Sequence, residues 1–280
     1  MKIIIHGGFF SESDTSAQVK IDKQNSLKEI CNQGYQYLQN HSALETVVHV
    51  VSLLENDPLY NAGTGSQIQS DGKIRMSAAL MDGHKLNMSG VINVENIQNP
   101  ILLAKELSGQ DDRFLSGEGA NAFAIKHHFP YYNPEIPQRR AEYIEKKNNI
   151  PTSTVGCVCI DQNNRIAAAT STGGKGFEIP GRVSDSATVA GNYANAFCGV
   201  SLTGVGEDII NGAMAAKIVT RVTDGMPIEV AFDKTFNELK QIDGFAGAIG
   251  IDHNGTIFHQ ESYPTMVYAS FDGKNWDVFD

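Results

Sequence analysis

The sequence has few cysteines, few basic residues and no long apolar segment. Its four cysteines form no C-x-x-C pair, which argues against a thiolate-rich zinc site and favours free, buried thiols. Lysine and arginine number 22 against 32 acidic residues, a net charge of −10, so nucleic acid and anionic membranes are poor candidates as partners. No apolar run reaches the roughly 18 residues of a membrane span, and the N-terminal run is too short for a signal peptide. We therefore expect a cytoplasmic protein.

Several common catalytic motifs are also missing. The sequence has no G-x-S-x-G element, which excludes the nucleophile elbow of the α/β-hydrolases. It has no phosphate-binding G-x-x-x-x-G-K-[ST] loop and no dinucleotide-binding G-x-G-x-x-G turn. The eight histidines lack the spacing of metal ligands. These absences leave threonine, carboxylate and arginine side chains as the candidates for chemistry.

The composition and the residue patterns predict one layered α/β domain. Of the 280 residues, 41% are hydrophobic and 19% are charged, an ordinary globular balance. Predicted helices are 26–40, with Ser26 as N-cap, 44–55, 100–107, 117–127, 207–222 and 227–241. Predicted strands are 2–5, 73–81, 89–94, 154–161, 165–170, 187–190, 196–203, 246–252, 256–260 and 265–270. Hairpins alternate with helix pairs, which favours a mostly antiparallel sandwich over βαβ units.

Residues 129–153 differ from the rest of the chain. This segment is rich in proline and charge, and it is predicted to be a surface linker with one short helix. It ends at Ser153, and a buried strand begins at Thr154. A threonine becomes a nucleophile when a base lies beside it, and its own α-amine can be that base if the chain is cut just before it. Threonine is also common in strands for its β propensity, so spacing alone leaves both interpretations open.

Two further segments hold groups that could bind a ligand. Arg182 and Asp185 lie three residues apart in a predicted loop. They are either a solvated surface pair or a site for an α-amino acid, whose carboxylate suits arginine and whose ammonium suits aspartate. The glycine-rich stretch 203–207 joins a strand to a helix, where backbone N–H groups could stabilise an anion.

Taken together, these segments resemble the plant-type asparaginase and isoaspartyl aminopeptidase family of N-terminal-nucleophile hydrolases. The matching segments, in order, are 5–8, 54–65, 81–83, 117–120, 154–161, 168–174, 180–186 and 203–207. The resemblance implies an αββα sandwich that is made as an inactive precursor and cut between Ser153 and Thr154. Residues 1–153 would form the α subunit, including the linker 129–153, and residues 154–280 the β subunit. A homodimer of αβ units is also implied.

The same resemblance assigns the chemistry to hydroxyl groups. Thr154 would cut the chain and then attack the side-chain amide of L-asparagine or of a β-aspartyl (isoaspartyl) dipeptide. Its free α-amine would act as the base, and Thr172 would support the nucleophile, Thr154, by a hydrogen bond. The hydroxyl of Thr203 and the N–H of Gly204 would form the oxyanion hole, usually the largest contribution in such reactions.

The resemblance also implies how the substrate is held. Arg182 would bind the α-carboxylate and Asp185 the α-ammonium, with backbone groups of Gly204 and Gly206 completing the anchor and Asn61 close by. No cofactor would be needed for catalysis. A structural sodium ion would be held by the backbone carbonyls of Leu54, Glu55, Asp57, Tyr60, Ala62 and Thr64.

Residues that differ from the family pattern leave two alternatives. Ser153 stands where the family usually has glycine or aspartate, which predicts slow self-cleavage because glycine relieves backbone restriction. One alternative is therefore an uncleaved, inactive relative that binds amino acids or partners. The other is an amidase for glycosylated asparagine, as in the glycosylasparaginases, ranked lower because no secretory signal is found. Ser184 and Val205 also replace a usual glycine and a usual threonine, which affects the expected substrate preference.

Overall fold

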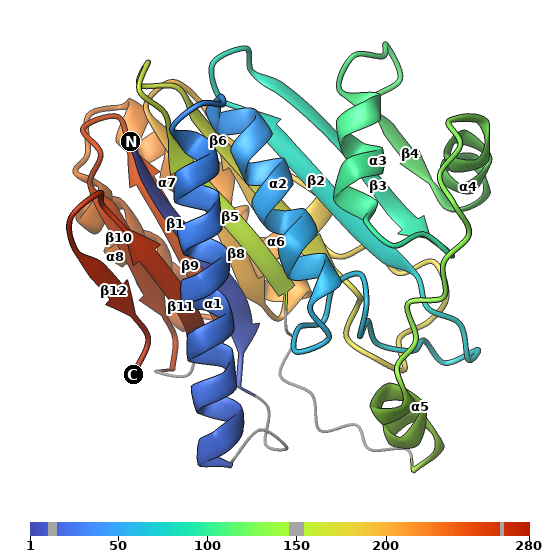
Figure 1. Ribbon diagram of the computed structural model, residues 1–280. Helices are drawn as coiled ribbons and strands as arrows, with labels where there is room; N and C mark the ends of the chain where they lie inside the picture. The colour runs from blue at the N-terminus through green and yellow to red at the C-terminus, as the bar shows by residue number, and fades with distance from the viewer. Residues whose placement is uncertain (11–15, 146–153, 264–265) are drawn as a thin grey trace.

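The computed structural model describes residues 1–10, 16–145, 154–263 and 266–280, and it contains two stacked β-sheets (Figure 1). The larger sheet has the order β12-β11-β1-β5-β6-β2-β3-β4, and the smaller β10-β9-β8-β7. All strand pairs are antiparallel except β3 with β4. The larger sheet consists of β1 (Lys2–Phe9), β2 (Met76–Asp82), β3 (Asn87–Val94), β4 (Phe114–Ser116), β5 (Thr154–Ile160), β6 (Ile166–Thr172), β11 (Met266–Phe271) and β12 (Trp276–Val278). The smaller sheet consists of β7 (Asn192–Ala194), β8 (Cys198–Gly204), β9 (Ala246–Asp252) and β10 (Ile257–Glu261).

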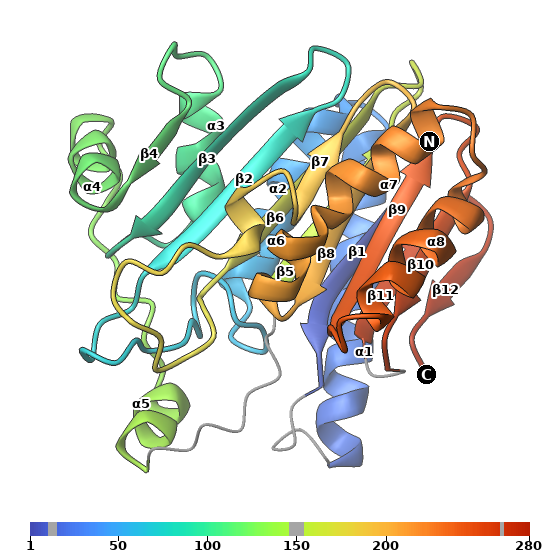
Figure 2. The same cartoon turned by 180° about the vertical axis from the view of Figure 1, so that it is seen from behind.

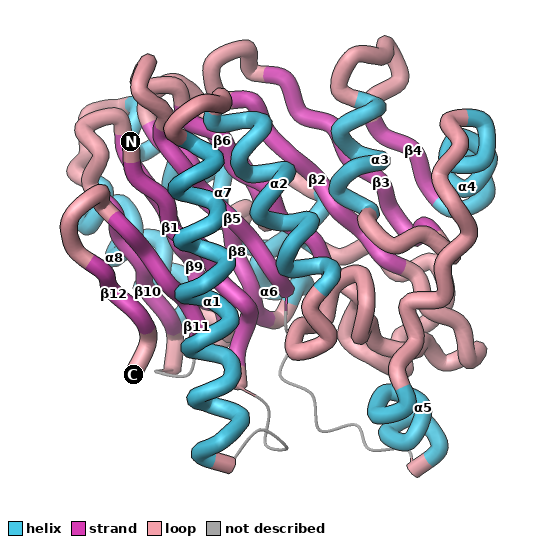
Figure 3. Tube along the Cα trace, viewed as in Figure 1, coloured by secondary structure: helices cyan, strands magenta, loops and turns pink. Residues whose placement is uncertain are grey.

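Helices cover the outer face of each sheet, which confirms the predicted αββα layering. On the larger sheet lie α1 (Ala17–Leu38), α2 (Ala43–Asn56) and α3 (Pro100–Leu107), seen in front in Figure 3. On the smaller sheet lie α7 (Met214–Thr223) and α8 (Ile228–Lys240), seen from behind in Figure 2. The remaining elements are α4 (Gly117–Lys126), α5 (Pro137–Ile144), α6 (Gly206–Gly212) and a 3₁₀ turn, η2 (Asp185–Ala187).

The central strands are buried on both faces. Every residue of β5, β6, β8 and β9 is buried, because helices cover one face and the opposite sheet covers the other. The four cysteines are free and buried, as predicted. Among the described residues, no helix has both the length and the apolar character needed to cross a membrane.

The first helix begins earlier than the sequence predicted. It starts at Ala17, where the Ser16 hydroxyl caps the helix by accepting a hydrogen bond from the Val19 N–H at 3.2 Å. Ser26, the predicted N-cap, lies inside the helix, and its hydroxyl donates to Asp57 at 2.5 Å. Of residues 17–26, Lys23 alone is buried, so the helical periodicity of apolar side chains was too weak to show this first part.

Two other predicted elements are wrong. The single helix expected over 207–222 is divided at Ala213, which has the left-handed backbone φ of 46° and separates α6 from α7. The strand expected over 187–190 is absent; residues 185–187 form η2 and the strand β7 follows at Asn192. The Thr188 N–H donates to the Asp185 carbonyl at 2.8 Å and the Gly191 N–H to the Thr188 carbonyl at 3.2 Å, so the backbone turns here and does not extend as a strand.

Candidate active site

Thr154 and Thr172 meet at the same end of two paired strands. The register of β5 and β6 places the two residues directly opposite each other. The Thr154 hydroxyl donates to the Thr172 hydroxyl at 3.3 Å, and both residues are 4% exposed. Thr172 Oγ1 also accepts a hydrogen bond from the Gly174 N–H at 3.3 Å. Strand pairing therefore brings together two residues that are eighteen positions apart in the sequence.

The turn after Thr172 is fastened to Asn61. The Gly173 N–H donates to the Asn61 carbonyl at 2.8 Å, and Asn61 Nδ2 donates to the Gly174 carbonyl at 2.6 Å. A β-carbon on Gly173 would lie 2.5 Å from Asn61 Oδ1, so glycine is required for this close approach. Asn61 Oδ1 in turn accepts from the Gln67 N–H at 2.9 Å. Asn61 thus positions the backbone next to Thr172.

Thr203 and Gly204 end strand β8 of the opposite sheet. Strands β5 and β6 pack face to face against β8, so the end of β8 lies across from the paired threonines. Thr203 is fully buried. Gly204 has a φ of 143°, and a β-carbon there would lie 2.5 Å from the Phe245 carbonyl oxygen. Only glycine fits this backbone position, which turns β8 toward α6.

Arg182 and Asp185 converge on Gly206. A β-carbon on Gly206 would lie 2.7 Å from an Arg182 guanidinium nitrogen and 2.8 Å from Asp185 Oδ1. Asp185 is 4% exposed, and its Oδ2 has no hydrogen-bond partner among the described residues. Burial raises the pKa of Asp185 to about 7, although Arg182 acts in the opposite direction. Asp185 is buried and Arg182 partly buried beside a glycine, so they are not the solvated surface pair that the local sequence left open.

Glu207 is a member of this site that the sequence-based assignment missed. Its carboxylate accepts from Arg182 Nε at 2.8 Å and from Arg182 NH2 at 3.0 Å, in a bidentate pair. Lys175 donates to the same carboxylate at 3.1 Å. The hydrogen bonds from Arg182 lower the pKa of Glu207 to about 2. Glu207 follows the glycine-rich stretch in the sequence, but nothing local to it shows that Arg182 is its partner.

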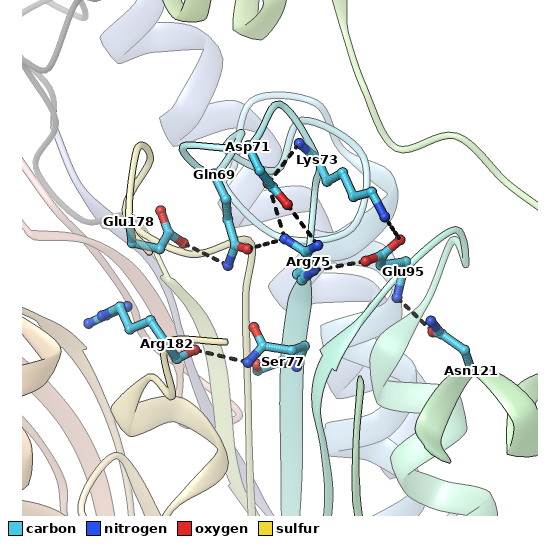
Figure 4. Close-up of polar contacts among 10 residues, drawn as sticks. Gln69, Asp71, Lys73, Arg75, Ser77, Glu95, Asn121, Glu178 and Arg182 are labelled. Atoms are coloured by element: carbon cyan, nitrogen blue, oxygen red, sulfur yellow. Dashed lines mark hydrogen bonds and ion pairs between the residues drawn. The ribbon is translucent and has the colours of Figure 1, made fainter. Parts of the chain in front are cut away.

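A network of charged and amide side chains holds the loop that carries Arg182 (Figure 4). Glu178, in that loop, accepts a hydrogen bond from Gln69 at 3.4 Å, and Gln69 accepts from Arg75 at 2.5 Å. Arg75 also pairs with Asp71 at 2.9 Å and with Glu95 at 2.8 Å. The loop is therefore tied to the ends of β2 and β3.

The backbone of the same loop is held at a second point. The carbonyl of Arg182 itself accepts from Asn93 Nδ2 at 3.1 Å, and Asn93 lies on β3. Within this part of the loop, the Phe177 N–H donates to the Ile68 carbonyl at 2.9 Å. These bonds fix the position from which the Arg182 guanidinium reaches Gly206.

The segment predicted to bind sodium forms a closed loop after α2. The Thr64 N–H donates to the Glu55 carbonyl at 2.7 Å, and the Asp57 N–H donates to the Leu54 carbonyl at 3.3 Å. Carbonyl oxygens of Pro58 and Tyr60 lie 3.0 Å from the position of a β-carbon on Gly65. The carbonyls of Pro58 and Tyr60 thus approach one point, and the carbonyl oxygens of Leu54 and Glu55, which each accept an N–H, keep a second lone pair.

The carboxylates of this loop, Glu55 and Asp57, accept hydrogen bonds from other parts of the protein and from the loop backbone. Glu55 is fully buried, and its Oε1 accepts from Ser171 Oγ at 2.6 Å and from the Ile101 N–H at 3.0 Å. Burial raises the pKa of Glu55 to about 8. Asp57 accepts from Ser26 and from the Leu59 N–H. A cation in this loop would therefore be bound by backbone carbonyls, a donor set that suits a hard monovalent cation. No cluster of three or more histidine, cysteine or acidic side chains within the described residues could hold a metal.

The predicted cleavage site is described on one side only. Thr154 is the first residue of β5, whereas Ser153 lies outside the described residues, as does the end of the predicted linker. The structure describes one short helix in that linker, α5, as the sequence predicted.

Comparison with known proteins identifies the family. The sequence profile of the asparaginase family matches residues 1–279. The chain belongs to the asparaginase family. It is 45% identical over 291 residues to an isoaspartyl peptidase/L-asparaginase of Synechocystis sp., covering 97% of this chain and 88% of the relative. It is 34% identical to an isoaspartyl peptidase of Escherichia coli, covering 91% and 88%. It is 33% identical to a plant-type L-asparaginase of Pyrococcus furiosus, covering 95% of each chain.

Membership in the asparaginase family confirms two predictions made from the sequence. The fold is the αββα sandwich of the N-terminal-nucleophile hydrolases. The protein is a hydrolase of the asparaginase and isoaspartyl peptidase type. Among the residues that the resemblance named, Thr154 lies beside Thr172, and Asn61 holds the turn after Thr172. Arg182 and Asp185 lie around Gly206, while Thr203 and Gly204 end the facing strand β8.

Proposed function

We propose that this protein hydrolyses the side-chain amide of L-asparagine and of β-aspartyl dipeptides, with Thr154 as nucleophile. The relatives at 34–45% identity carry names for this activity. One observation supports the assignment most strongly: the hydroxyl of Thr154 meets that of Thr172 at the end of a fully buried hairpin. Thr154 also directly follows the proline-rich, charged segment where a cut would free its α-amine.

The nucleophile is proposed to act in two stages. The chain is first cut between Ser153 and Thr154, which gives Thr154 a free α-amine. In catalysis this amine removes the proton of the Thr154 hydroxyl, whose oxygen attacks the side-chain amide carbon. The negative charge that develops on the carbonyl oxygen is stabilised by the Thr203 hydroxyl and the Gly204 N–H. The amine returns the proton to the leaving nitrogen, and water then hydrolyses the aspartyl ester on Thr154.

The charged groups are proposed to hold the amino acid half of the substrate. The Nε and NH2 atoms of Arg182 face Glu207, so a substrate carboxylate would use NH1 and the second hydrogen of NH2. Asp185 Oδ2, which is buried without a partner among the described residues, would accept from the α-ammonium. Anchors for both α groups exclude ordinary α-aspartyl peptides, whose α-carboxyl group is part of the peptide bond.

Intact-mass measurement tests this proposal. The purified wild-type chain, followed over days at 37 °C, should split into residues 1–153 and 154–280 and gain activity on L-asparagine and isoaspartyl dipeptides as it does so. Thr154→Ala should stay whole and inactive, and Ser153→Gly should cut faster. A whole chain that hydrolyses these substrates would refute the mechanism. A chain that stays whole and inactive would favour the binding-only alternative, and hydrolysis of glycosylated asparagine alone would favour the glycosylasparaginase alternative.

A structural sodium ion is proposed for the carbonyls of 54–64. Because a ligand that binds the folded state alone raises its stability, the thermal midpoint should rise with sodium chloride. Choline chloride at the same ionic strength is the control, and equal midpoints in both salts would contradict the proposal. A homodimer of αβ units and a cytoplasmic location are proposed as well. Size-exclusion chromatography with light scattering tests the first, and cell fractionation tests the second.

A further inference from the structure

Directly below the catalytic threonines lies a second layer of buried polar groups. Along a strand, every second residue points to the same face. Thr170 on β6 and Ser201 on β8 therefore lie on the same faces as Thr172 and Thr203, one step further into the sandwich. On β5 the equivalent position is Gly156, which pairs with Thr170 on one side and with His6 of β1 on the other.

The side chains of this layer bond to one another across the two sheets. The Thr170 hydroxyl lies 2.7 Å from that of Ser201, and the Ser201 hydroxyl lies 2.9 Å from His6 Nε2. A β-carbon on Gly156 would lie 2.0 Å from Ser201 Oγ and 2.4 Å from His6 Nε2. Glycine at position 156 therefore makes room for the layer, because any larger residue would push the two groups apart.

His6 connects this layer to the nucleophile. It is fully buried, and burial lowers the pKa of its imidazole to about 3, so the ring is neutral under ordinary conditions. A backbone interaction with Thr154 acts in the opposite direction, toward a higher pKa. His6 Nδ1 is buried without a hydrogen-bond partner among the described residues, so the link to Thr154 is the strand pairing of His6 with Gly156, two residues after Thr154 on β5.

We propose that His6, Ser201 and Thr170 form a positioning layer that fixes the backbone of Thr154 and the facing strand β8. With a neutral imidazole, His6 Nε2 accepts from the Ser201 hydroxyl, which in turn accepts from the Thr170 hydroxyl. This arrangement sets the orientation of the Thr154 hydroxyl and α-amine relative to Thr203, two residues beyond Ser201. These are positioning residues: none of them touches the substrate or the reacting atoms.

This inference rests on Thr154 being the nucleophile, and its effects should be separable from substrate binding. Thr170→Val, Ser201→Ala and His6→Gln should each slow self-cleavage and lower kcat by about 10- to 100-fold, since small misplacement of reacting groups has effects of that size. KM should stay within about threefold, because Arg182 and Asp185 bind the substrate from a different loop. The measurements are intact mass against time, steady-state kinetics on an isoaspartyl dipeptide, and the thermal midpoint of each variant.

Thr235→Val is the matched control. Thr235 is 1% exposed on α8, where its hydroxyl donates to the Ala231 carbonyl and accepts from Arg221. The Thr235→Val variant therefore also loses hydrogen bonds of a buried threonine. It should lower the thermal midpoint without changing self-cleavage or kcat. Wild-type rates of self-cleavage and catalysis in Thr170→Val and Ser201→Ala would overturn the inference, even if His6→Gln did not fold. An equal loss of these rates in the Thr235→Val control would overturn it as well. Activity in Thr154→Ala would instead refute the proposed nucleophile.

Discussion

The candidate site joins two regions that are built in opposite ways. The hydroxyl region, Thr154, Thr172 and Thr203, is uncharged, lies on the ends of paired strands and is buried. The anchor region, Arg182, Asp185 and Glu207, is charged and lies on a loop and the start of a short helix; Glu207 is half exposed. Attack on a carbonyl needs rigid placement, which a buried hairpin supplies. Binding an amino acid needs charges, and charges are least costly at the edge of the core.

The two regions differ in what it costs to bury their polar groups. Even at the edge of the core, burial raises the pKa of Asp185 to about 7, and one of its oxygens has no partner among the described residues. Arg182 is kept in place by the opposite charge of Glu207. The hydroxyl region needs no such compensation, because each hydroxyl both donates and accepts. Changes to the anchor region should therefore act on binding and on pH dependence, and changes to the hydroxyl region on the rate of chemistry.

The largest expected effect within the anchor region is that of Arg182→Ala. It removes the proposed partner of the substrate α-carboxylate and leaves Glu207 without its bidentate pair. We expect kcat/KM for isoaspartyl dipeptides to fall by about 100-fold or more, which is the usual size when one side of a partly buried charge pair is truncated. Self-cleavage should continue, because Thr154 and Thr172 are unchanged. Arg221→Ala is the control, since Arg221 is similarly buried but pairs with Glu238 on α8. Near-normal kcat/KM would contradict the assignment.

A smaller effect is expected from Glu207→Gln, which keeps the shape of the side chain and removes its charge. Arg182 should then be less well fixed, and KM should rise by about tenfold with kcat within about twofold, the pattern of lost ground-state binding. Glu238→Gln is a close control, because Glu238 also accepts from one arginine and one lysine, Arg221 and Lys217. Steady-state kinetics on L-asparagine would show the split. A fall in kcat with unchanged KM would mean that Glu207 acts on the rate of the chemical step and not on substrate binding.

The raised pKa of Asp185 predicts a dependence on pH. In the unfolded chain its pKa is near 4, so between about pH 4 and pH 7 the folded state binds more protons. Folding stability from this group is therefore complete below about pH 4, decreases as the pH rises to about 7 and is constant above it. Asp185→Asn should raise the thermal midpoint by a few degrees at pH 8 and leave it unchanged at pH 4.

The same residue should set part of the pH dependence of substrate binding. In the proposed function the ionised form of Asp185 pairs with the α-ammonium, so wild-type KM should fall as the pH rises through about 7. In Asp185→Asn the KM should be high and independent of pH over this range. A variant that kept the wild-type KM profile would show that another group binds the ammonium.

The smallest effect is expected from Lys175→Met. Lys175 and Glu207 are both about half exposed, and exposed ion pairs contribute about 1 kcal/mol or less. We expect KM to change by less than about threefold, and the thermal midpoint to stay within a degree or two. Lys217→Met tests the equivalent position next to Glu238. A change in KM as large as that of Glu207→Gln would mean that Lys175 itself contacts the substrate.

Local patterns predicted the hydroxyl region better than the anchor region. The start of β5 at Thr154 was visible because a polar, proline-rich segment gives way to a run of apolar and β-branched residues. Helix α2 was placed within a residue at each end, since its apolar face repeats regularly. By contrast, the strand predicted over 187–190 is absent, and the turn η2 (Asp185–Ala187) was not predicted, because the small residues of this segment carry no clear periodicity. The early start of α1 was missed for the same reason.

The sequence by itself determines the secondary-structure preference of each segment, and it contains motifs that match a known family. Here that was enough for the layered fold and for the start of β5 at Thr154, while the site roles that the resemblance assigned stay predictions. The pairing of Arg182 with Glu207 and the contact of His6 with Ser201 are different in kind. The first spans 25 positions and the second 195. Such contacts exist because strand register and sheet stacking bring distant residues to one place, and no local pattern contains that information.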